Sequence, residues 1–571
     1  YPNQPDCLHL RALCLKAMQQ WQGAEMCFKQ ALQHMPHSAQ IMTNYANLLS
    51  ELARHQEAAS LYSRIVTMDP NQINAWVGGF LAAIQMGHLE AAQKHAENFT
   101  KTHPMQAVAW ECLGSACRKL EDLPAAEQAY EKATDIDPNN GKAWLNLAVV
   151  KRLLGKSKHA EPCAQKARAA GLQGPELLDV EASLLLDKGQ VTDAIAAYKT
   201  ICQSYPHYVL AYDALTKILW EYYPDDNPLK PLQDASQQNP QHMGLQLSYV
   251  RHLLESEQWQ PALDKIDSLK DSIHPGYGAY LTGQSLSGLG KDQEAYDTYT
   301  KAVSYIPDDL SLRNSFAHFL LKIGRPEEML QHGQYVTERK PDDQIAWAYL
   351  GTAWRLLGDN RENWLHQYDD LIVPLEVDIP DHFTSREEFC QALKAALEPM
   401  HISTHEPIDQ SLNNGTQTGS NLFGFPEGVI KDVRDAIQRT VRAYQSRLPT
   451  DPEHPFLSRK GSDIYFQGAW SVRLRSSGFH KNHVHNKGWL SSAFYVDLPQ
   501  SVKQSDGQSK AGWISFGQPL HTLGLDLEPR RYIQPKEGTI AVFPSYTWHG
   551  TVPFDDDYHR LTMAFDMVPI G

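Results

Sequence analysis

Three histidines lie within six residues near the C-terminal end of the chain, in the segment HKNHVH at 480–485. With 25 histidines in 571 residues, one His-x-His pair is expected by chance, so its meaning depends on the residues around it. If the segment is a β-strand, His483 and His485 share one face because side chains alternate, whereas His480 has the opposite parity. Two imidazoles on one face of a strand can bind a single metal ion.

A third imidazole and a guanidinium follow further along the chain. The segment FPSYTWHGTVPF at 543–554 presents His549 directly after an apolar run, and Arg560 opens the later run RLTMAFDMV. Iron, zinc and copper all accept imidazole ligands, and a planar guanidinium can hold a carboxylate through two hydrogen bonds. The three imidazoles therefore predict a metal site. The alternative is a turn cluster of histidines that binds no metal.

The elements that carry these residues are short predicted β-strands, which begin at residue 464. They are separated by Gly and Pro, and they read IYFQGAWSVRLRS, HKNHVH, WLSSAFYVDLP, GWISFG, RYIQPKEGTIAVFP, HGTVPF and RLTMAFDMV. Several short strands with such punctuation predict a small sandwich or barrel over 464–571. The preceding segment, 367–463, is predicted to be a linker with two amphipathic helices, at 385–400 and 427–448, that pack on the barrel.

The chain from residue 1 to 366 repeats a unit of 34 residues. Positions that keep this period are Pro36, Pro70, Pro104 and Pro138; Ala24, Ala58, Ala92 and Ala126; and Trp76, Trp110 and Trp144. This unit resembles the tetratricopeptide (TPR) repeat, a pair of antiparallel helices. Small residues such as Gly114 let the two helices approach closely, and the Pro ends the second helix. We expect about ten units, degenerate near 209–275, in an α-solenoid whose concave face binds a protein or peptide.

Composition excludes several classes of protein. The net charge of −15 disfavours a nucleic-acid binder, because neutralising phosphates requires a surplus of Lys and Arg. No apolar run is long enough to cross a bilayer, so no membrane role is expected. The eight cysteines form no CxxC pair, which is typical of reduced thiols in a cytoplasmic protein. The sequence begins at Tyr1, so a segment upstream of it stays an open question.

The β-rich part resembles a known enzyme superfamily. Its order of His-x-His, distal His and Arg is similar to that of the Fe(II)/2-oxoglutarate-dependent oxygenases of the double-stranded β-helix, or jelly-roll, fold. More narrowly, SLNNGTQT, the stretch from GAWSVRLRS through FYVDLP, and GTIAVFPSYTWHGTVPF with RLTMAF resemble the 2-oxoglutarate/Fe(II) oxygenases fused to TPR repeats in bacteria. The resemblance covers about residues 410–569. It implies Fe(II), 2-oxoglutarate and O₂ as cofactor and co-substrates, and hydroxylation as the reaction.

The resemblance also implies roles for particular residues. In the superfamily, a His-x-Asp/Glu…His triad holds the iron and leaves positions open for 2-oxoglutarate and O₂. Carried onto this chain, the ligands are His483, His485 and His549, with His485 in the place of the usual carboxylate. This departure leaves the metal its full positive charge, so a three-histidine zinc site is the alternative. Arg560 corresponds to the residue that pairs with the distal carboxylate of 2-oxoglutarate.

Further side chains are candidates for the surroundings of the metal. Tyr495 could donate a second hydrogen bond to the same carboxylate, although packing inside the barrel is equally expected. Arg473, which shares a strand face with Arg475, is an alternative anion-binding residue, and Asp497 could supply the missing carboxylate. The residues expected to line the pocket or contact substrate are His480, Trp489, Gln417 and Trp548, with core packing as the alternative for the two tryptophans.

Three functions remain open at this stage. In the first, the TPR array presents a protein or peptide to the iron centre, which hydroxylates one of its side chains. In the second, the same oxygenase acts on a small molecule, and the array serves assembly, for example as a homo-oligomer. In the third, the chain is a non-catalytic TPR adaptor with a vestigial or metal-sensing barrel.

Overall fold

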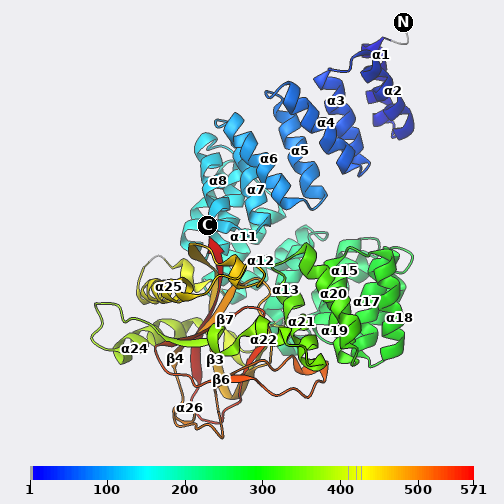
Figure 1. Ribbon diagram of the computed structural model, residues 1–571. Helices are drawn as coiled ribbons and strands as arrows, with labels where there is room; N and C mark the ends of the chain where they lie inside the picture. The colour runs from blue at the N-terminus through cyan, green and yellow to red at the C-terminus, as the bar shows by residue number, and fades with distance from the viewer. Residues whose placement is uncertain (1–3, 409, 420, 426, 571) are drawn as a thin grey trace. The chain divides into compact units, whose positions relative to one another are not determined.

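The computed structural model describes residues 4–408, 410–419, 421–425 and 427–570 (Figure 1). The chain forms two compact units, Tyr1–Glu181 and Ala182–Gly571. The first unit is helical, whereas the second combines further helical pairs with the β-rich part. The compact units therefore divide inside the helical array and not at residue 366, where the repeat pattern ends.

The first unit is built from helical pairs of nearly constant length. Its helices are α1 (Pro5–Ala17), α2 (Trp21–His34), α3 (Ala39–Glu51), α4 (His55–Met68), α5 (Ile73–Gln85), α6 (Leu89–Thr102), α7 (Ala107–Lys119), α8 (Leu123–Ile136), α9 (Gly141–Leu153) and α10 (Ser157–Ala169). The close approach within a pair is visible at Gly114, where an added Cβ would lie 2.9 Å from the ring of Tyr130. A side chain there would force α7 and α8 apart.

The periodic Trp and Pro residues have a shared structural reason. The indole Nε1 of Trp76 donates to the carbonyl oxygen of Pro70 at 2.8 Å, six residues earlier. The same bond recurs in the repeats that contain Trp110, Trp144 and Trp347. Each bond ties the first helix of a repeat to the turn before it and satisfies a carbonyl that has no partner within the preceding helix. The 34-residue spacing therefore marks the turns between repeats.

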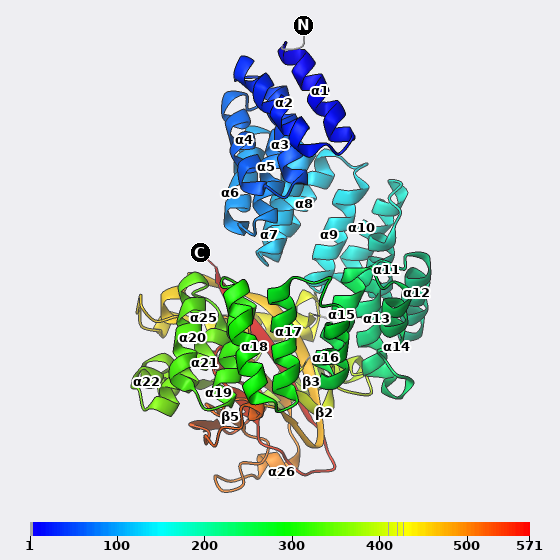
Figure 2. The same cartoon turned by 90° about the vertical axis from the view of Figure 1, so that its right-hand side faces the viewer.

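The helical array continues through α22, with α11 (Pro175–Asp187) at the boundary between the units. The remaining helices are α12 (Val191–Ser204), α13 (Val209–Tyr222), α14 (Lys230–Gln238), α15 (Met243–Glu255), α16 (Trp259–Ser268), α17 (Pro275–Gly288), α18 (Asp292–Tyr305), α19 (Leu310–Lys322), α20 (Pro326–Arg339), α21 (Gln344–Leu357) and α22 (Arg361–His366). Figure 2 shows α13 to α20 as successive neighbours. The described residues thus form eleven pairs, against the roughly ten predicted.

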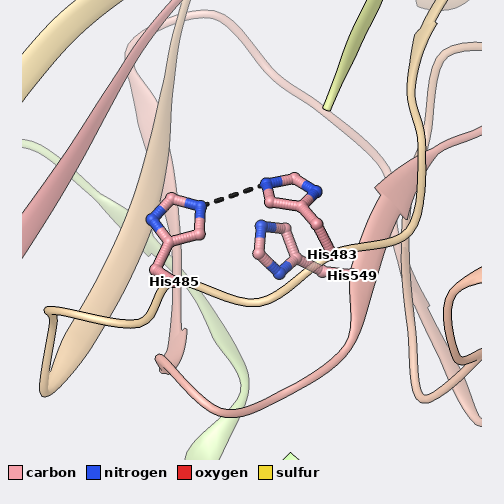
Figure 3. Close-up of side chains that lie close together, drawn as sticks. All are labelled: His483, His485 and His549. Carbon is pink, nitrogen blue, oxygen red and sulfur yellow. Dashed lines mark hydrogen bonds between the residues drawn. The ribbon is translucent and has the colours of Figure 1, made fainter. Parts of the chain in front are cut away.

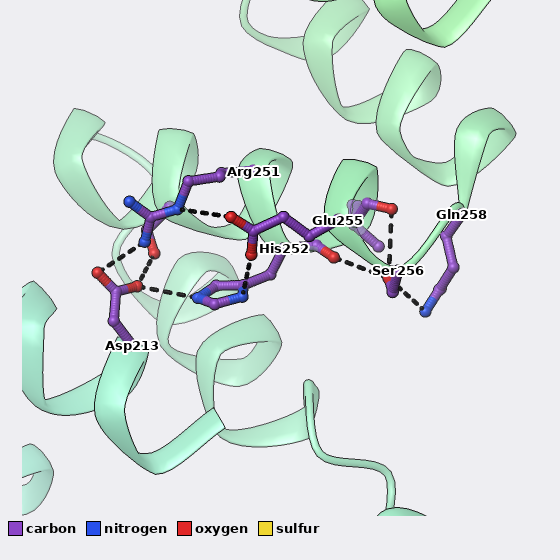
Figure 4. Close-up of polar contacts among 8 residues, drawn as sticks. Asp213, Arg251, His252, Glu255, Ser256 and Gln258 are labelled. Atoms are coloured by element: carbon purple, nitrogen blue, oxygen red, sulfur yellow. Dashed lines mark hydrogen bonds and ion pairs between the residues drawn. The ribbon is translucent and has the colours of Figure 1, made fainter. Parts of the chain in front are cut away.

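A polar network joins two helices of the degenerate repeats. Asp213 on α13 accepts a hydrogen bond from the buried His252 of α15 at 3.2 Å and pairs with Arg251 at 2.8 Å (Figure 4). His252 also contacts Glu255 at 3.0 Å. Burial opposes the charged imidazole, but both carboxylates favour it, and the pKa of His252 is raised. An ion network therefore joins α13 to α15 in this irregular part.

The β-rich part consists of two antiparallel sheets. One has six strands in the order β1-β7-β4-β9-β3-β2, and the other has three in the order β6-β5-β8. The strands are β1 (Val373–Glu376), β2 (Leu412–Gln417), β3 (Asp463–His480), β4 (Leu490–Asp497), β5 (Ile514–Phe516), β6 (Arg531–Ile533), β7 (Thr539–Pro544), β8 (His549–Thr551) and β9 (Arg560–Ile570). Val472 and Phe543 of the larger sheet pack with Phe516 of the smaller one. Two sheets that share a core confirm the predicted jelly-roll class.

Helices cover the outer face of the larger sheet. Helix α24 (Arg386–Leu397) packs against β4, and α25 (Val429–Arg447) packs against β3. The alternation along β9 separates the two faces, because Leu561, Met563 and Phe565 belong to the helix-covered core. The intervening residues face the inside of the sandwich.

The strands differ from the prediction in two places. Strands β1 and β2 lie before residue 464, in the part predicted to be a linker, where β1 pairs with β7 and β2 pairs with β3. Both are edge strands of mixed polarity, so no run of apolar residues marks them in the sequence. Residues 481–485, predicted to be a strand, are irregular apart from an isolated bridge between His483 and His549.

Within the second unit, the last helical pair is bound to the β-rich part by several polar contacts. Arg355 on α21 donates to the carbonyl oxygens of Gly517 and Glu528, both at 2.7 Å. The indole of Trp548 donates to the hydroxyl of Thr352 at 2.9 Å. The last TPR pair therefore belongs to the same compact body as the sheets. In the part of the chain that is described, no helix is long and apolar enough to span a membrane.

Candidate metal centre

Three imidazoles converge at one end of the sandwich. The possible ligand atoms of His483, His485 and His549 all lie within 4.8 Å of one another (Figure 3). The Nε2 atoms of His483 and His485 are 3.2 Å apart, and the ring centroids of His483 and His549 are 4.2 Å apart. The fold therefore brings together the three histidines that the sequence predicted as metal ligands. His483 and His485 come from an irregular segment, and His549 comes from β8.

Hydrogen bonds fix the tautomer of each imidazole. The Nδ1 atom of His483 lies 2.8 Å from the carbonyl oxygen of Lys481, and that of His549 lies 3.0 Å from the carbonyl oxygen of Thr547. The Nδ1 atom of His485 lies 2.5 Å from a carboxylate oxygen of Asp566. Carbonyl and carboxylate oxygens accept, so each Nδ1 donates to them, and the Nε2 atoms are left to face the point where the three rings meet.

The Nε2 atoms of the three rings face one another, and those of His483 and His485 share a hydrogen bond. Burial lowers the pKa of His483 to about 3, with the neighbouring His485 adding to the effect. The pKa of His549 lies well below its ordinary value for the same reason, burial first and the neighbouring imidazoles second. Three imidazoles aimed at one point are suited to a divalent cation, which would take all three as ligands.

Backbone pairing places the distal histidine against the His-x-His segment. The amide of His483 donates to the carbonyl oxygen of His549 at 3.0 Å, and the reverse bond measures 3.1 Å. The residue that follows is glycine, and a Cβ at Gly550 would lie 2.2 Å from the side-chain oxygen of Asn482 and 3.0 Å from the carbonyl oxygen of His480. This close approach holds the two histidine-bearing segments in register without a regular strand.

The histidines line a cavity of about 550 Å³, a size typical of small-molecule sites. Four alternate residues of β9 form one wall: Arg560, Thr562, Ala564 and Asp566. Ile345 on α21 also lines the cavity, so the last TPR pair contributes to the wall of the metal site.

Arg560 is a buried cation without an anionic partner. Its side chain is 2% exposed, and its Nε atom has no hydrogen-bond partner among the described residues. The hydroxyl of the fully buried Tyr495 is likewise unpartnered there, and the Arg560 guanidinium carbon lies 5.4 Å from the Tyr495 ring centroid. Burial raises the pKa of Tyr495 to about 12, so the hydroxyl keeps its proton. Two unsatisfied donors beside the cavity match a carboxylate ligand.

Two other predicted residues line the same cavity. His480 contacts it with its ring centroid 5.7 Å from that of His483, and its Nδ1 atom lies 3.2 Å from the Ser411 hydroxyl. Gln417 on β2 also lines the cavity. Both are therefore placed where a substrate would lie next to the metal.

The two predicted tryptophans do not line the cavity. The indole of Trp489 donates to the carbonyl oxygen of Phe456 at 2.8 Å and stacks on the Phe456 ring. Trp548 packs against α21 through its bond to Thr352. Packing explains both residues, because each indole is buried and donates to an acceptor away from the histidines.

Arg473 and Asp497 also lie outside the site. On β3, Trp470 faces the cavity, so Arg473 points to the opposite face, where it donates to the carbonyl oxygen of His401 at 3.3 Å. Asp497 pairs with Lys394 at 2.8 Å and accepts from the Tyr558 hydroxyl. Strand alternation therefore places Arg473 outside the cavity, and Asp497 forms its ion pair away from the cavity.

Sequence reasoning missed Asp566, the carboxylate behind His485. Its signal was present in the alternation of β9, since Asp566 has the same parity as Arg560 and must face the same cavity. Ile345 was missed for a different reason, because no sequence pattern links a helix of the array to a sheet more than a hundred residues later.

Comparison with protein families agrees with both halves of this arrangement. Residues 468–566 match a family described as "Putative 2OG-Fe(II) oxygenase". Residues 15–77, 79–141 and 129–161 match families described as "Tetratricopeptide repeat". No curated protein matches the chain. The chain therefore carries TPR repeats in its N-terminal part and a C-terminal domain that matches this oxygenase family.

Several solved structures are similar to part of the chain. MamA from Desulfovibrio magneticus RS-1 is 18% identical, with 29% of this chain and 94% of that chain covered and a TM-score of 0.27. A TPR protein from Thermus thermophilus is 20% identical, with 32% and 99% covered and a TM-score of 0.28. Yeast Tom70 is 10% identical, with 63% and 90% covered and a TM-score of 0.39.

Proposed function

We propose that this chain, which joins TPR repeats to a domain of the 2OG-Fe(II) oxygenase type, hydroxylates a side chain of a protein or peptide. The observation that carries the proposal is the pairing of two features in one cavity. Three imidazoles converge at one point, and a buried guanidinium whose Nε atom has no hydrogen-bond partner among the described residues lies on the same cavity wall. The first suits a divalent metal, and the second suits a dicarboxylate bound beside it.

The residues present fit the group that the family implies. His483, His485 and His549 would hold Fe(II), which when bound supplies the activation of O₂ and couples it to decarboxylation of 2-oxoglutarate. Arg560 and the Tyr495 hydroxyl would bind the distal carboxylate of 2-oxoglutarate, because both are buried donors that lack an acceptor. Together they fix the orientation of the co-substrate in the cavity.

The remaining wall of the cavity supports a polypeptide substrate. His480 and Gln417 offer polar contacts next to the metal, and the depressed pKa of His480, caused by burial and neighbouring imidazoles, keeps this ring neutral. Ile345 brings the last TPR pair to the same cavity. A substrate held by the last TPR pair would therefore lie next to this cavity.

Turnover of 2-oxoglutarate tests the reaction class. We expect the iron-loaded protein to convert 2-oxoglutarate and O₂ to succinate, with His549→Ala reducing the rate to background. A matched control is His382→Ala, because His382 is an exposed histidine that pairs with Asp432. Equal succinate formation by His549→Ala and the unmodified protein would exclude the assigned ligand set. No succinate from any form would exclude the reaction itself.

A second measurement tests the class of substrate. We expect mass spectrometry of a peptide library to detect oxygen addition that requires 2-oxoglutarate and disappears in His549→Ala. Oxygen addition confined to small metabolites in a parallel incubation would instead support the assembly role of the array.

A further inference from the structure

A buried carboxylate lies directly behind the ligand that departs from the family pattern. Asp566 accepts a hydrogen bond from His485 Nδ1 at 2.5 Å and another from the Ser491 hydroxyl at 2.6 Å. The residue is only 9% exposed, and the ion pair that its carboxylate forms within the described chain is the one with His485.

The sheet places this carboxylate with little freedom to move. Asp566 lies on β9 opposite Ser491 of β4 on one side and opposite Gly468 of β3 on the other. The Ser491 hydroxyl also contacts that of Ser545 at 2.7 Å, immediately before the segment that carries His549. A Cβ at Gly488 would lie 2.3 Å from the Ser545 hydroxyl, so the backbone leaves room for this network.

We propose that Asp566 is the positioning residue that supplies, through His485, the negative charge that the all-histidine triad lacks. The superfamily pattern has a carboxylate bound directly to the metal, whereas here the carboxylate bonds to the far nitrogen of the imidazole in that place. A charge-assisted bond to Nδ1 fixes the ring and raises the basicity of Nε2, which strengthens its bond to a cation. This inference rests on the proposed metal site but not on the oxygenase reaction.

Metal affinity measures this role without turnover. The metal-free full chain is titrated with Co(II) by calorimetry, and the visible absorption of bound Co(II) reports on the ligands. Asp566→Asn keeps the size and an oxygen acceptor but removes the charge, so we expect affinity to fall about 10- to 100-fold, the usual effect of losing such a partner. We also expect the Co(II) absorption bands to shift.

Asp497→Asn is the matched control. Asp497 is a carboxylate of the same domain with 6% exposure that pairs with Lys394 instead of a metal ligand. We expect Asp497→Asn to bind Co(II) with an affinity within about twofold of that of the unmodified chain. This change is smaller than the effect of removing a hydrogen-bond partner of a metal ligand. Equal affinities for Asp566→Asn and Asp497→Asn, in folded proteins, would overturn the proposal and leave the metal site standing.

Two further variants keep the outcomes distinct. If Asp566→Asn does not fold, Ser491→Ala replaces it, since it keeps the carboxylate and removes its hydrogen bond from Ser491 together with the contact to the Ser545 hydroxyl. We expect its affinity to fall between that of the unmodified chain and the loss expected for Asp566→Asn, and an affinity equal to the Asp497→Asn control would overturn the proposal. Co(II) binding by His549→Ala that equals the unmodified chain would instead overturn the metal site on which the proposal rests.

Discussion

The β-rich part should not fold without the last TPR pair. A chain of residues 367–571 corresponds to the linker and barrel that the repeat pattern delimits, but it lacks α21 and α22. A chain of residues 174–571 keeps every element from α11 onward. We expect the longer chain to unfold cooperatively and to bind metal like the full protein, because each repeat depends mainly on its neighbours.

The hydrogen bonds that the shorter chain cannot form set the magnitude. They include both Arg355 bonds, the bond of Trp548 to Thr352, and that of the Tyr546 hydroxyl to the carbonyl oxygen of Leu365 at 2.8 Å. At about 1 kcal/mol for each hydrogen bond, these four contribute roughly 4 kcal/mol. Trp548 and Tyr546 are 4% and 1% exposed, and each would lose roughly 2 kcal/mol of apolar burial.

The summed loss from these hydrogen bonds and buried side chains approaches the whole free energy of unfolding of a typical domain, about 5–15 kcal/mol. We therefore expect residues 367–571 to show no cooperative thermal transition by circular dichroism and no stoichiometric Co(II) binding. The comparison is made against residues 174–571 at equal concentration. If the shorter chain melted within a few degrees of the longer one and bound Co(II) with equal affinity, the last TPR pair would be shown dispensable for the barrel.

Three further predictions concern single residues. Burial first, and then Arg473, lower the pKa of His401 to about 3, so below about pH 6.5 the unfolded chain binds a proton at this residue that the folded chain does not. The free energy of unfolding therefore falls as the pH drops from about 6.5 toward 3, with up to about 1.4 kcal/mol per pH unit from this residue. His401→Asn should reduce the slope measured for the whole protein by urea unfolding by that amount. Arg560→Met should raise the 2-oxoglutarate concentration that gives half-maximal succinate formation by about 10- to 100-fold, which is the effect of losing a charged hydrogen bond. Co(II) affinity should stay unchanged. An unchanged dependence on 2-oxoglutarate would show that Arg560 does not bind this anion. Thr352→Val leaves the Trp548 indole only a 3.3 Å contact to the carbonyl oxygen of Ala348. The free energy of unfolding of the second unit, followed by thermal unfolding, should therefore fall by about 1 kcal/mol. An unchanged midpoint would contradict the anchoring role of the bond to Thr352.

The sequence alone determined the repeat architecture and most of the metal site. The 34-residue period could be read from the sequence because the periodic Trp and Pro are joined by a local hydrogen bond. The candidate metal ligands could also be named from the sequence, because the order of His483, His485, His549 and Arg560 resembles that of an oxygenase superfamily. Alternation along β9 also contained the information that Arg560 and Asp566 share one face.

Only the tertiary structure decided how these residues meet. The segment 481–485 is not a strand, and His483 reaches His549 through an isolated backbone bridge that depends on a glycine at 550. Alternation cannot say which face of a strand is the inner one, so Arg473 was assigned to a site that lies on the other side of its sheet. The wall contributed by Ile345 depends on contacts between distant segments. Such contacts are selected by packing of whole elements, and they leave no periodic or local trace in the sequence.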